Sequence, residues 1–180
     1  MIEREIFLQK KKIVVVDGAI STNEILKAAL VCTDAPLVRK GSSNPGESHT
    51  QHYVSKSSLD MIRQSAVFRI VETAVKRHFL KSPTCYRIVY REIVYGDHMA
   101  YHHDSSEGAV TAMIYMNDSW EDNNHGETLF LDENGIGNCV MPAPGRLLIF
   151  DSALKHSSSA PSRTYFGTRQ VLVLNFSEAE

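Results

Sequence analysis

The stretch YRIVYREIVY, residues 86–95, begins a series of short β-rich segments that decides the fold. Its uncharged residues are β-branched or aromatic, the types that are enriched in strands. Similar segments follow to the end of the chain, separated by turns such as Pro144-Gly145. The predicted strands are 86–95, 99–102, 110–116, 128–131, 139–141, 147–150, 155–158 and 169–176.

Eight short strands without helices between them predict a mainly β fold, a sandwich or jelly roll. Upstream, Ile13–Val16 predicts a buried strand, and the spacing of Ser21 and Glu24 is that of a capping box that starts a helix over 22–31. Apolar residues at helical spacing predict a second helix over about 58–78. Two N-terminal helices are therefore expected to buttress the sheets.

Length and composition predict one domain over residues 1–180. The chain is 43% hydrophobic and 22% charged, which is enough to bury a sizeable core. Residues 1–83 are expected to form the helical support and residues 84–176 the jelly-roll core. A net charge of -2 provides no positive field of the kind that attracts nucleic acid or anionic membranes.

Cysteine usage and hydropathy indicate the compartment. Cys32, Cys85 and Cys139 are widely separated, which suits buried free thiols better than a disulfide framework and favours a reducing cytoplasm. The longest apolar run near the N-terminus, Ile13–Val16, is too short for a signal peptide or a membrane span. We expect a cytoplasmic protein without a membrane partner.

The segment Tyr101-His102-His103-Asp104 carries the chemistry that the sequence predicts. Side chains alternate between faces in an extended chain, so His102 and Asp104 point the same way and His103 points away. One histidine from a later strand would complete the two-histidine, one-carboxylate triad of non-haem Fe(II) oxygenases. His156 is the candidate, although an H-x-D triplet alone is often a solvated turn.

An ordered set of motifs resembles the prolyl-hydroxylase branch of the Fe(II)/2-oxoglutarate-dependent dioxygenases. Each motif alone is weak, but their order is specific, and together they cover about half of the chain. They are residues 95–104, 110–120, 126–130 and 142–151, His156, and residues 167–176.

The resemblance implies a double-stranded β-helix, cupin-like fold with iron held by His102, Asp104 and His156. It also implies that Arg169 pairs with the distal carboxylate of 2-oxoglutarate, and a guanidinium can bind a carboxylate through two hydrogen bonds. Arg163, in the preceding loop, is the competing arginine.

Three further residues match positions that contact the cosubstrate in this branch: Tyr115, Tyr95 and Thr128. A plain role in the core is the alternative for both tyrosines. The chain departs from the family pattern at His125-Gly126, where Gly-Gly is usual, and at Asn175, where tryptophan is common. The stretch from His156 to Arg169 is also longer than in many relatives.

The implied function is an Fe(II)-, 2-oxoglutarate- and O2-dependent hydroxylase of an amino acid, a peptide or protein residue, or a small metabolite. Proline-containing targets are suggested by the resemblance alone. The alternatives are a cupin-type metal enzyme without 2-oxoglutarate and a non-catalytic jelly-roll binding module. Residues 40–57 are expected to be either a lid or an ordinary surface loop, and residues 117–125 are a second lid candidate.

Overall fold

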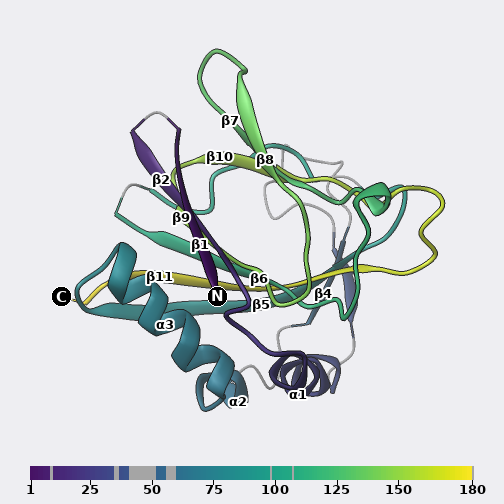
Figure 1. Ribbon diagram of the computed structural model, residues 1–180, viewed down its shortest axis with the longest axis horizontal. Helices are drawn as coiled ribbons and strands as arrows, with labels where there is room; N and C mark the ends of the chain where they lie inside the picture. The colour runs from purple at the N-terminus through teal and green to yellow at the C-terminus, as the bar shows by residue number, and fades with distance from the viewer. Residues whose placement is uncertain are drawn as a thin grey trace.

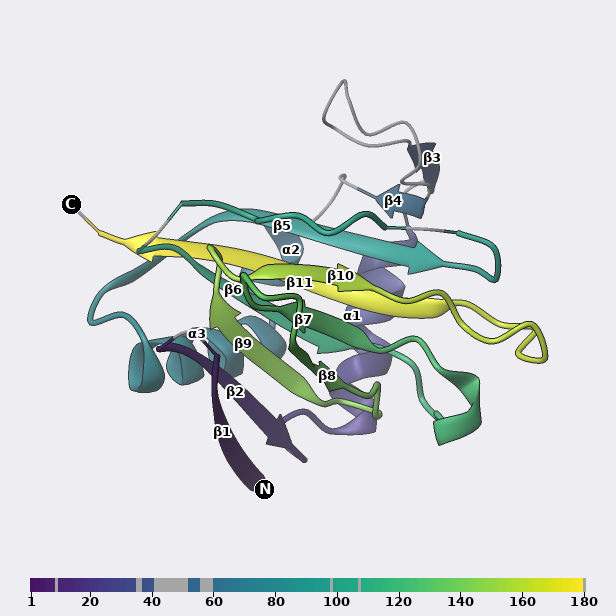
Figure 2. The ribbon, with the colours of Figure 1, turned by 90° about the horizontal axis from the view of Figure 1, so that it is seen from above.

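The structure is a computed structural model that describes residues 1–8, 10–34, 37–40, 52–55, 60–97, 99–106 and 108–179. Its larger sheet has the antiparallel order β1-β2-β9-β6-β11-β5-β4-β3 (Figure 1). Strands β1 and β3 lie at opposite edges of this sheet (Figure 2). The strands are β1 (Ile2–Leu8), β2 (Lys11–Asp17), β3 (Val38–Lys40), β4 (His52–Ser55), β5 (Pro83–Ile93), β6 (Val110–Tyr115), β9 (Leu147–Asp151) and β11 (Arg169–Glu178).

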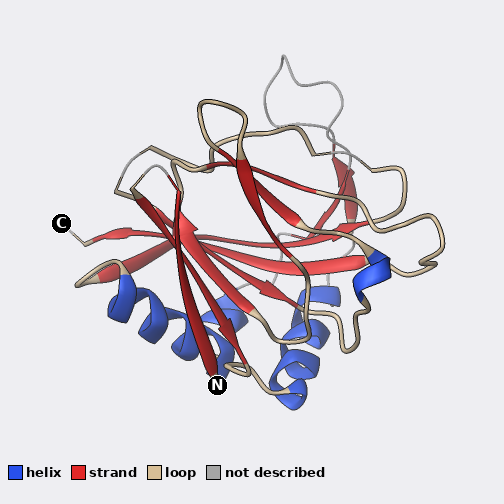
Figure 3. Ribbon diagram, turned by 45° about the horizontal axis from the view of Figure 1, so that its top comes forward, coloured by secondary structure: helices blue, strands red, loops and turns tan. Residues whose placement is uncertain are grey.

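A smaller sheet and three helices cover the two faces of the larger sheet (Figure 3). The smaller sheet has the order β10-β7-β8, with β7 at Thr128–Leu131, β8 at Gly137–Val140 and β10 at Lys155–Ser158. The helices are α1 (Thr22–Thr33), α2 (Asp60–Arg63) and α3 (Ala66–His78), and a 3-10 turn, η1, spans Asp122–Asn124. This two-sheet arrangement with helices outside agrees with the predicted mainly β fold.

Both faces of the central strands are buried, which explains their continuous apolar runs. In β11, Leu172 and Leu174 belong to the core under the helices, whereas Val171 and Val173 belong to the core between the sheets. Strands β2, β6 and β9 alternate in the same way. A strand buried on both faces reads as uninterrupted hydrophobic sequence, since successive side chains point to opposite faces.

The helices begin where capping residues occur. Ser21 accepts a hydrogen bond from the Glu24 amide, and the Glu24 carboxylate accepts one from the Ser21 amide, so the predicted capping box is present. The long helix predicted over 58–78 is divided instead. Helix α2 ends at Arg63, and Ser65 caps α3 by accepting from the Phe68 amide. A serine that caps a new helix interrupts the helical pattern.

Several other expectations require correction. Residues 99–102 do not form a strand, and His102 makes only an isolated bridge to His156. The loop expected over 40–57 contains strand β4, which pairs with β5. Its residues 41–51, 56 and 57 lie outside the described residues. The thiols of Cys32 and Cys85 are buried as expected, whereas Cys139 is exposed.

The N-terminal region contributes strands as well as helices, because β2 pairs with β9 in the larger sheet. Within the described part of the chain, no helix combines the length and the apolarity that crossing a bilayer requires.

Candidate metal centre

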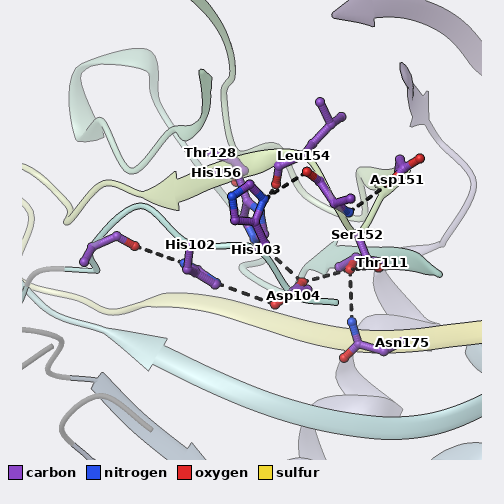
Figure 4. Close-up of polar contacts among 12 residues, drawn as sticks. His102, His103, Asp104, Thr111, Thr128, Asp151, Ser152, Leu154, His156 and Asn175 are labelled. Carbon is purple, nitrogen blue, oxygen red and sulfur yellow. Dashed lines mark hydrogen bonds and ion pairs between the residues drawn. The ribbon is translucent and has the colours of Figure 1, made fainter. Parts of the chain in front are cut away.

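His102, Asp104 and His156 converge at one end of the space between the two sheets (Figure 4). Their ligand atoms all lie within 4.8 Å of one another. His102 Nε2 is 3.5 Å from one carboxylate oxygen of Asp104, and His156 Nε2 is 3.7 Å from the other. His156 lies on β10, and the backbone bridge between His102 and His156 aligns the H-x-D segment with that strand.

Backbone carbonyls orient both imidazole rings. His102 Nδ1 is 3.0 Å from the Ala100 carbonyl oxygen, and His156 Nδ1 is 2.9 Å from that of Leu154. A carbonyl oxygen can only accept, so each Nδ1 carries a proton, and in the neutral imidazole the lone pair is then on Nε2. Both lone pairs therefore belong to the nitrogens that face Asp104, as metal coordination requires.

Thr111 holds the carboxylate of Asp104 in place. Its hydroxyl donates to Asp104 Oδ2 at 2.8 Å and accepts a hydrogen bond from Asn175 Nδ2 at 3.0 Å. The Ser152 hydroxyl lies 2.8 Å from the hydroxyl oxygen of Thr111. One hydroxyl group on β6 thus connects Asp104 to β11 and to the end of β9.

The electrostatics of this site keep its ligands in the forms that bind a metal. Burial raises the pKa of Asp104, but the contact with His102, the charge of Arg91 and the hydrogen bond from Thr111 outweigh burial and hold the pKa below its ordinary value. Burial lowers the pKa of His156 to about 4. At neutral pH the carboxylate is therefore ionised and His156 is neutral.

A second polar cluster surrounds Arg169, which is fully buried at the start of β11. Its Nε donates to the Gly126 carbonyl at 2.6 Å, and its Nη2 donates to the Thr128 hydroxyl at 2.9 Å. The Tyr115 hydroxyl lies 2.8 Å from the Thr128 hydroxyl, and the guanidinium carbon lies 5.3 Å from the centre of the Tyr115 ring. Nη1 of Arg169 is buried without a partner.

The other candidates lie elsewhere. Arg163 is exposed in the loop before β11, and Tyr95 is 61% exposed in the turn after β5, outside both clusters. His103 is exposed and its ring contacts the Ala153 carbonyl, so it faces away as expected. His125 has a φ of 56°. Glycine adopts such a conformation without strain, which accounts for the glycine usual at this position of the motif.

Sequence reasoning missed Thr111 and Arg91, and it named Asn175 only as a departure from the family pattern. Arg91 lines the cavity beside the metal centre together with His102 and Asp104. The cavity has a volume of about 20 Å³, room for about one water molecule. A signal for Arg91 was present, since it interrupts an apolar strand at a position that shares its face with Ile93.

Two neutral imidazoles and one carboxylate are the donors that suit Fe(II) in oxygenases with open coordination positions. The unpartnered Nη1 of Arg169 offers a buried cationic donor for an anion. The residues present therefore fit a metal ion and a carboxylate ligand, although they are grouped in two separate clusters.

Solved structures share this fold at low sequence identity. A prolyl-4-hydroxylase from Pseudomonas putida has a TM-score of 0.65 and 16% identity, with 93% of each chain covered. A prolyl hydroxylase from Trichoplax adhaerens, in complex with a hypoxia inducible factor peptide fragment, has a TM-score of 0.68 and 14% identity, covering 91% of this chain and 82% of that one.

A third similar structure is the epimerase SnoN in complex with Fe3+, alpha ketoglutarate and nogalamycin RO. It has a TM-score of 0.72 and 16% identity, and the match covers 93% of this chain and 79% of that one. No curated protein matches the chain. These similarities confirm the double-stranded β-helix fold that the sequence resemblance implied.

A family model of the 2OG-Fe(II) oxygenase superfamily matches residues 88–177, half of the sequence, and this range contains all three residues of the candidate metal centre. The chain therefore belongs to the 2OG-Fe(II) oxygenase superfamily, which uses Fe(II), 2-oxoglutarate and O2.

Proposed function

We propose that this oxygenase is a hydroxylase whose iron is held by His102, Asp104 and His156. The observation that carries the proposal is the convergence of the three ligand atoms within 4.8 Å, with both Nδ1 atoms already bound to carbonyls. Bound iron and 2-oxoglutarate supply oxidative cleavage of a C-H bond: substrate, 2-oxoglutarate and O2 give hydroxylated substrate, succinate and CO2.

The chain's own residues bind and orient these reactants. Arg169, with its free Nη1, is proposed to bind the distal carboxylate of 2-oxoglutarate. Thr128 and Tyr115 orient Arg169, since the Thr128 hydroxyl accepts from its Nη2 and the Tyr115 ring lies beside its guanidinium. Buried apolar residues between the sheets exclude water from this region, which strengthens the ion pair. Tyr95, exposed in a turn, has no support for a cosubstrate role.

The proposed substrate is an amino acid, a peptide or protein residue, or a small metabolite. Similar structures hold a peptide fragment or a natural product, which supports both classes. Residues 117–125 are proposed to border the entrance. Asn117 ties their start to the last strand, because its side chain accepts from the Gln170 amide and donates to the Thr168 carbonyl.

The triad is tested by metal binding and turnover. We expect the wild-type protein to bind one Fe(II) and to form succinate with a substrate from a panel of amino acids, proline-containing peptides and metabolites. Asp104→Ala should abolish turnover and sharply weaken metal binding, because it removes the only anionic ligand. His103→Ala is the matched control, since its ring faces away, and it should behave as wild type.

A mass gain of one oxygen in the product would identify hydroxylation rather than another outcome of C-H cleavage, such as epimerisation. Stoichiometric metal binding without succinate formation would favour the alternative of a cupin-type enzyme. A protein that binds no metal would be a binding module. Wild-type turnover by Asp104→Ala would refute the proposed triad.

The arginine assignment is tested by comparing two variants. Arg169→Ala should raise the KM for 2-oxoglutarate by about 100-fold, because a buried charge-assisted pair is lost. Arg163→Ala removes the same charge from an exposed loop position and should leave this KM almost unchanged. The opposite ranking would assign the cosubstrate to Arg163.

A further inference from the structure

Arg91 is a half-buried cation beside the candidate metal centre, and its buried Nε has no hydrogen-bond partner within the described chain. It lies on β5 and lines the cavity that His102, Asp104 and His156 also line. The Asp104 carboxylate contacts Thr111 and the two histidines, and Arg91 acts on it only through its charge. An unpaired buried donor calls for an explanation, and a missing ligand is one.

The strand register places Arg91 between the two clusters described above. Arg169 is opposite Ile93, and Val171 is opposite both Arg91 and Tyr115. Along the strands, Arg91 therefore lies two residues nearer than Arg169 to Thr111 and the metal centre. This position and its place in the cavity lining put Arg91 next to the candidate metal centre on the side toward Arg169.

The charges around Arg91 indicate that the missing ligand is an anion. The charged groups that act on Arg91 from the described elements around it are Asp104, Arg87 and Arg169, and only Asp104 is negative. Burial lowers the pKa of Arg91, which reflects the cost of keeping this cation away from water. A divalent metal held by Asp104 would add further positive charge. An anion beside the metal would stabilise both cations.

We propose that Arg91 is a second carboxylate-binding residue of the cosubstrate site. It pairs with the carboxylate of 2-oxoglutarate at the metal end, whereas Arg169 pairs with the distal carboxylate. This inference rests on the proposed function of Arg169 and the triad. Because the cavity has a volume of only about 20 Å³, lining side chains must move when a dicarboxylate binds. Arg91, with four rotatable bonds and no partner for Nε, is suited to do so.

Binding of two ligands separates the roles of the two arginines. 2-Oxopentanoate has the oxo acid group of 2-oxoglutarate but no distal carboxylate. Anaerobic calorimetry on the Fe(II)-loaded protein should show that Arg91→Met weakens both ligands by the same factor, about 10- to 100-fold. Arg169→Met should weaken 2-oxoglutarate alone. Arg91→Lys keeps the charge without the planar fork and should fall between wild type and Arg91→Met.

Arg87→Met is the matched control. It removes an arginine four residues earlier on the same strand that acts on Arg91 through its charge but does not line the cavity, so it should weaken both ligands far less than Arg91→Met does. Thermal unfolding without ligands adds a second readout. Arg91→Met should raise the Tm of the unliganded protein, because it removes a buried Nε donor that has no hydrogen-bond partner. A merely structural arginine would give a lower Tm.

Three results would overturn the inference. Unchanged 2-oxoglutarate affinity in both Arg91 variants would exclude a cosubstrate role, and a selective loss of affinity for the primary substrate would assign Arg91 to that molecule. A lower Tm of unliganded Arg91→Met would make the residue structural. Failure of the proposed function would look different from failure of this inference. In that case the wild-type Fe(II) protein itself would bind no 2-oxoglutarate.

Discussion

At the scale of single residues, the Thr111 hydroxyl determines how Asp104 is presented. It accepts from Asn175, lies within hydrogen-bond distance of Ser152 and donates to Asp104 Oδ2. Thr111, Ser152 and Asn175 are buried, and so is the side chain of Asp104. Partners behind a metal ligand fix its orientation, and their loss typically weakens metal binding without removing a ligand.

Replacing Thr111 with valine should therefore weaken Fe(II) binding by about 10- to 100-fold. The substitution keeps the shape of the side chain but removes the donor to Asp104 and leaves Asn175 Nδ2 without its acceptor. It should also lower the free energy of unfolding by about 1–3 kcal/mol. Metal titration and denaturant unfolding measure the two effects.

Thr111→Ser is the control, because it changes the size of the side chain by removing the methyl group but keeps the hydroxyl. It should retain most of the metal affinity. Equal affinities of the valine variant and the wild-type protein would show that Asp104 does not depend on this contact.

At the scale of secondary-structure elements, an ion pair attaches the end of β2 to the turn before β9. Arg146 Nε donates to Asp17 Oδ1 at 2.6 Å, and its Nη2 donates to Oδ2 at 3.2 Å. Arg4, on the edge strand β1, also pairs with Asp17. Burial raises the pKa of Asp17, but the two arginines outweigh burial and hold this pKa below 3.8.

The contribution of Asp17 to stability should depend on pH. A carboxyl whose pKa is lower in the folded state stabilises the fold above its unfolded pKa, near 3.8, and loses that effect as the pH falls through the folded value. Asp17→Asn should therefore lower the free energy of unfolding at pH 7 by about 1 kcal/mol, and the difference should shrink only below pH 3.8.

Denaturant unfolding of both proteins from pH 7 to pH 3 measures this difference. Asp60→Asn is the control, because its ion pair with Arg63 is on the surface and should contribute almost nothing. A difference between Asp17→Asn and wild type that stayed constant down to pH 3 would show that the charge of Asp17 is not responsible.

At the scale of the whole molecule, the proposed ligands should stabilise the fold by linkage. Ligands that bind only the folded chain add a free energy that grows with concentration, about 2.7 kcal/mol at 100 times the Kd. Fe(II) should therefore raise the Tm under anaerobic conditions, and 2-oxoglutarate should raise it further when the metal is present. A chelator should reverse both increases.

Asp104→Ala is the control for specific binding, and its Tm should respond to neither ligand. A stabilisation of the wild-type protein by 2-oxoglutarate after the metal has been removed would indicate that Arg169 binds the cosubstrate independently. A Tm that did not change with Fe(II) would contradict a metal centre in the folded protein.

The sequence by itself determined the features that depend on local spacing. The apolar runs of β2, β6, β9 and β11 indicated buried strands, because strands covered on both faces need few polar residues. Ser21 and Glu24 indicated the start of α1. The H-x-D spacing put two ligand side chains on one side of the chain, and the order of motifs indicated the superfamily that the family match confirms.

Only the tertiary structure decided which distant groups meet. The order of motifs had indicated His156, but only the tertiary structure shows that it pairs with His102, which is far from it in sequence. Thr111 and Arg91 became candidates only when folding placed them beside the cavity, and the role of Asn175 became clear only when strand pairing placed it opposite Thr111. The physical reason is that spacing along a strand sets the face of a side chain, whereas strand pairing sets its neighbours.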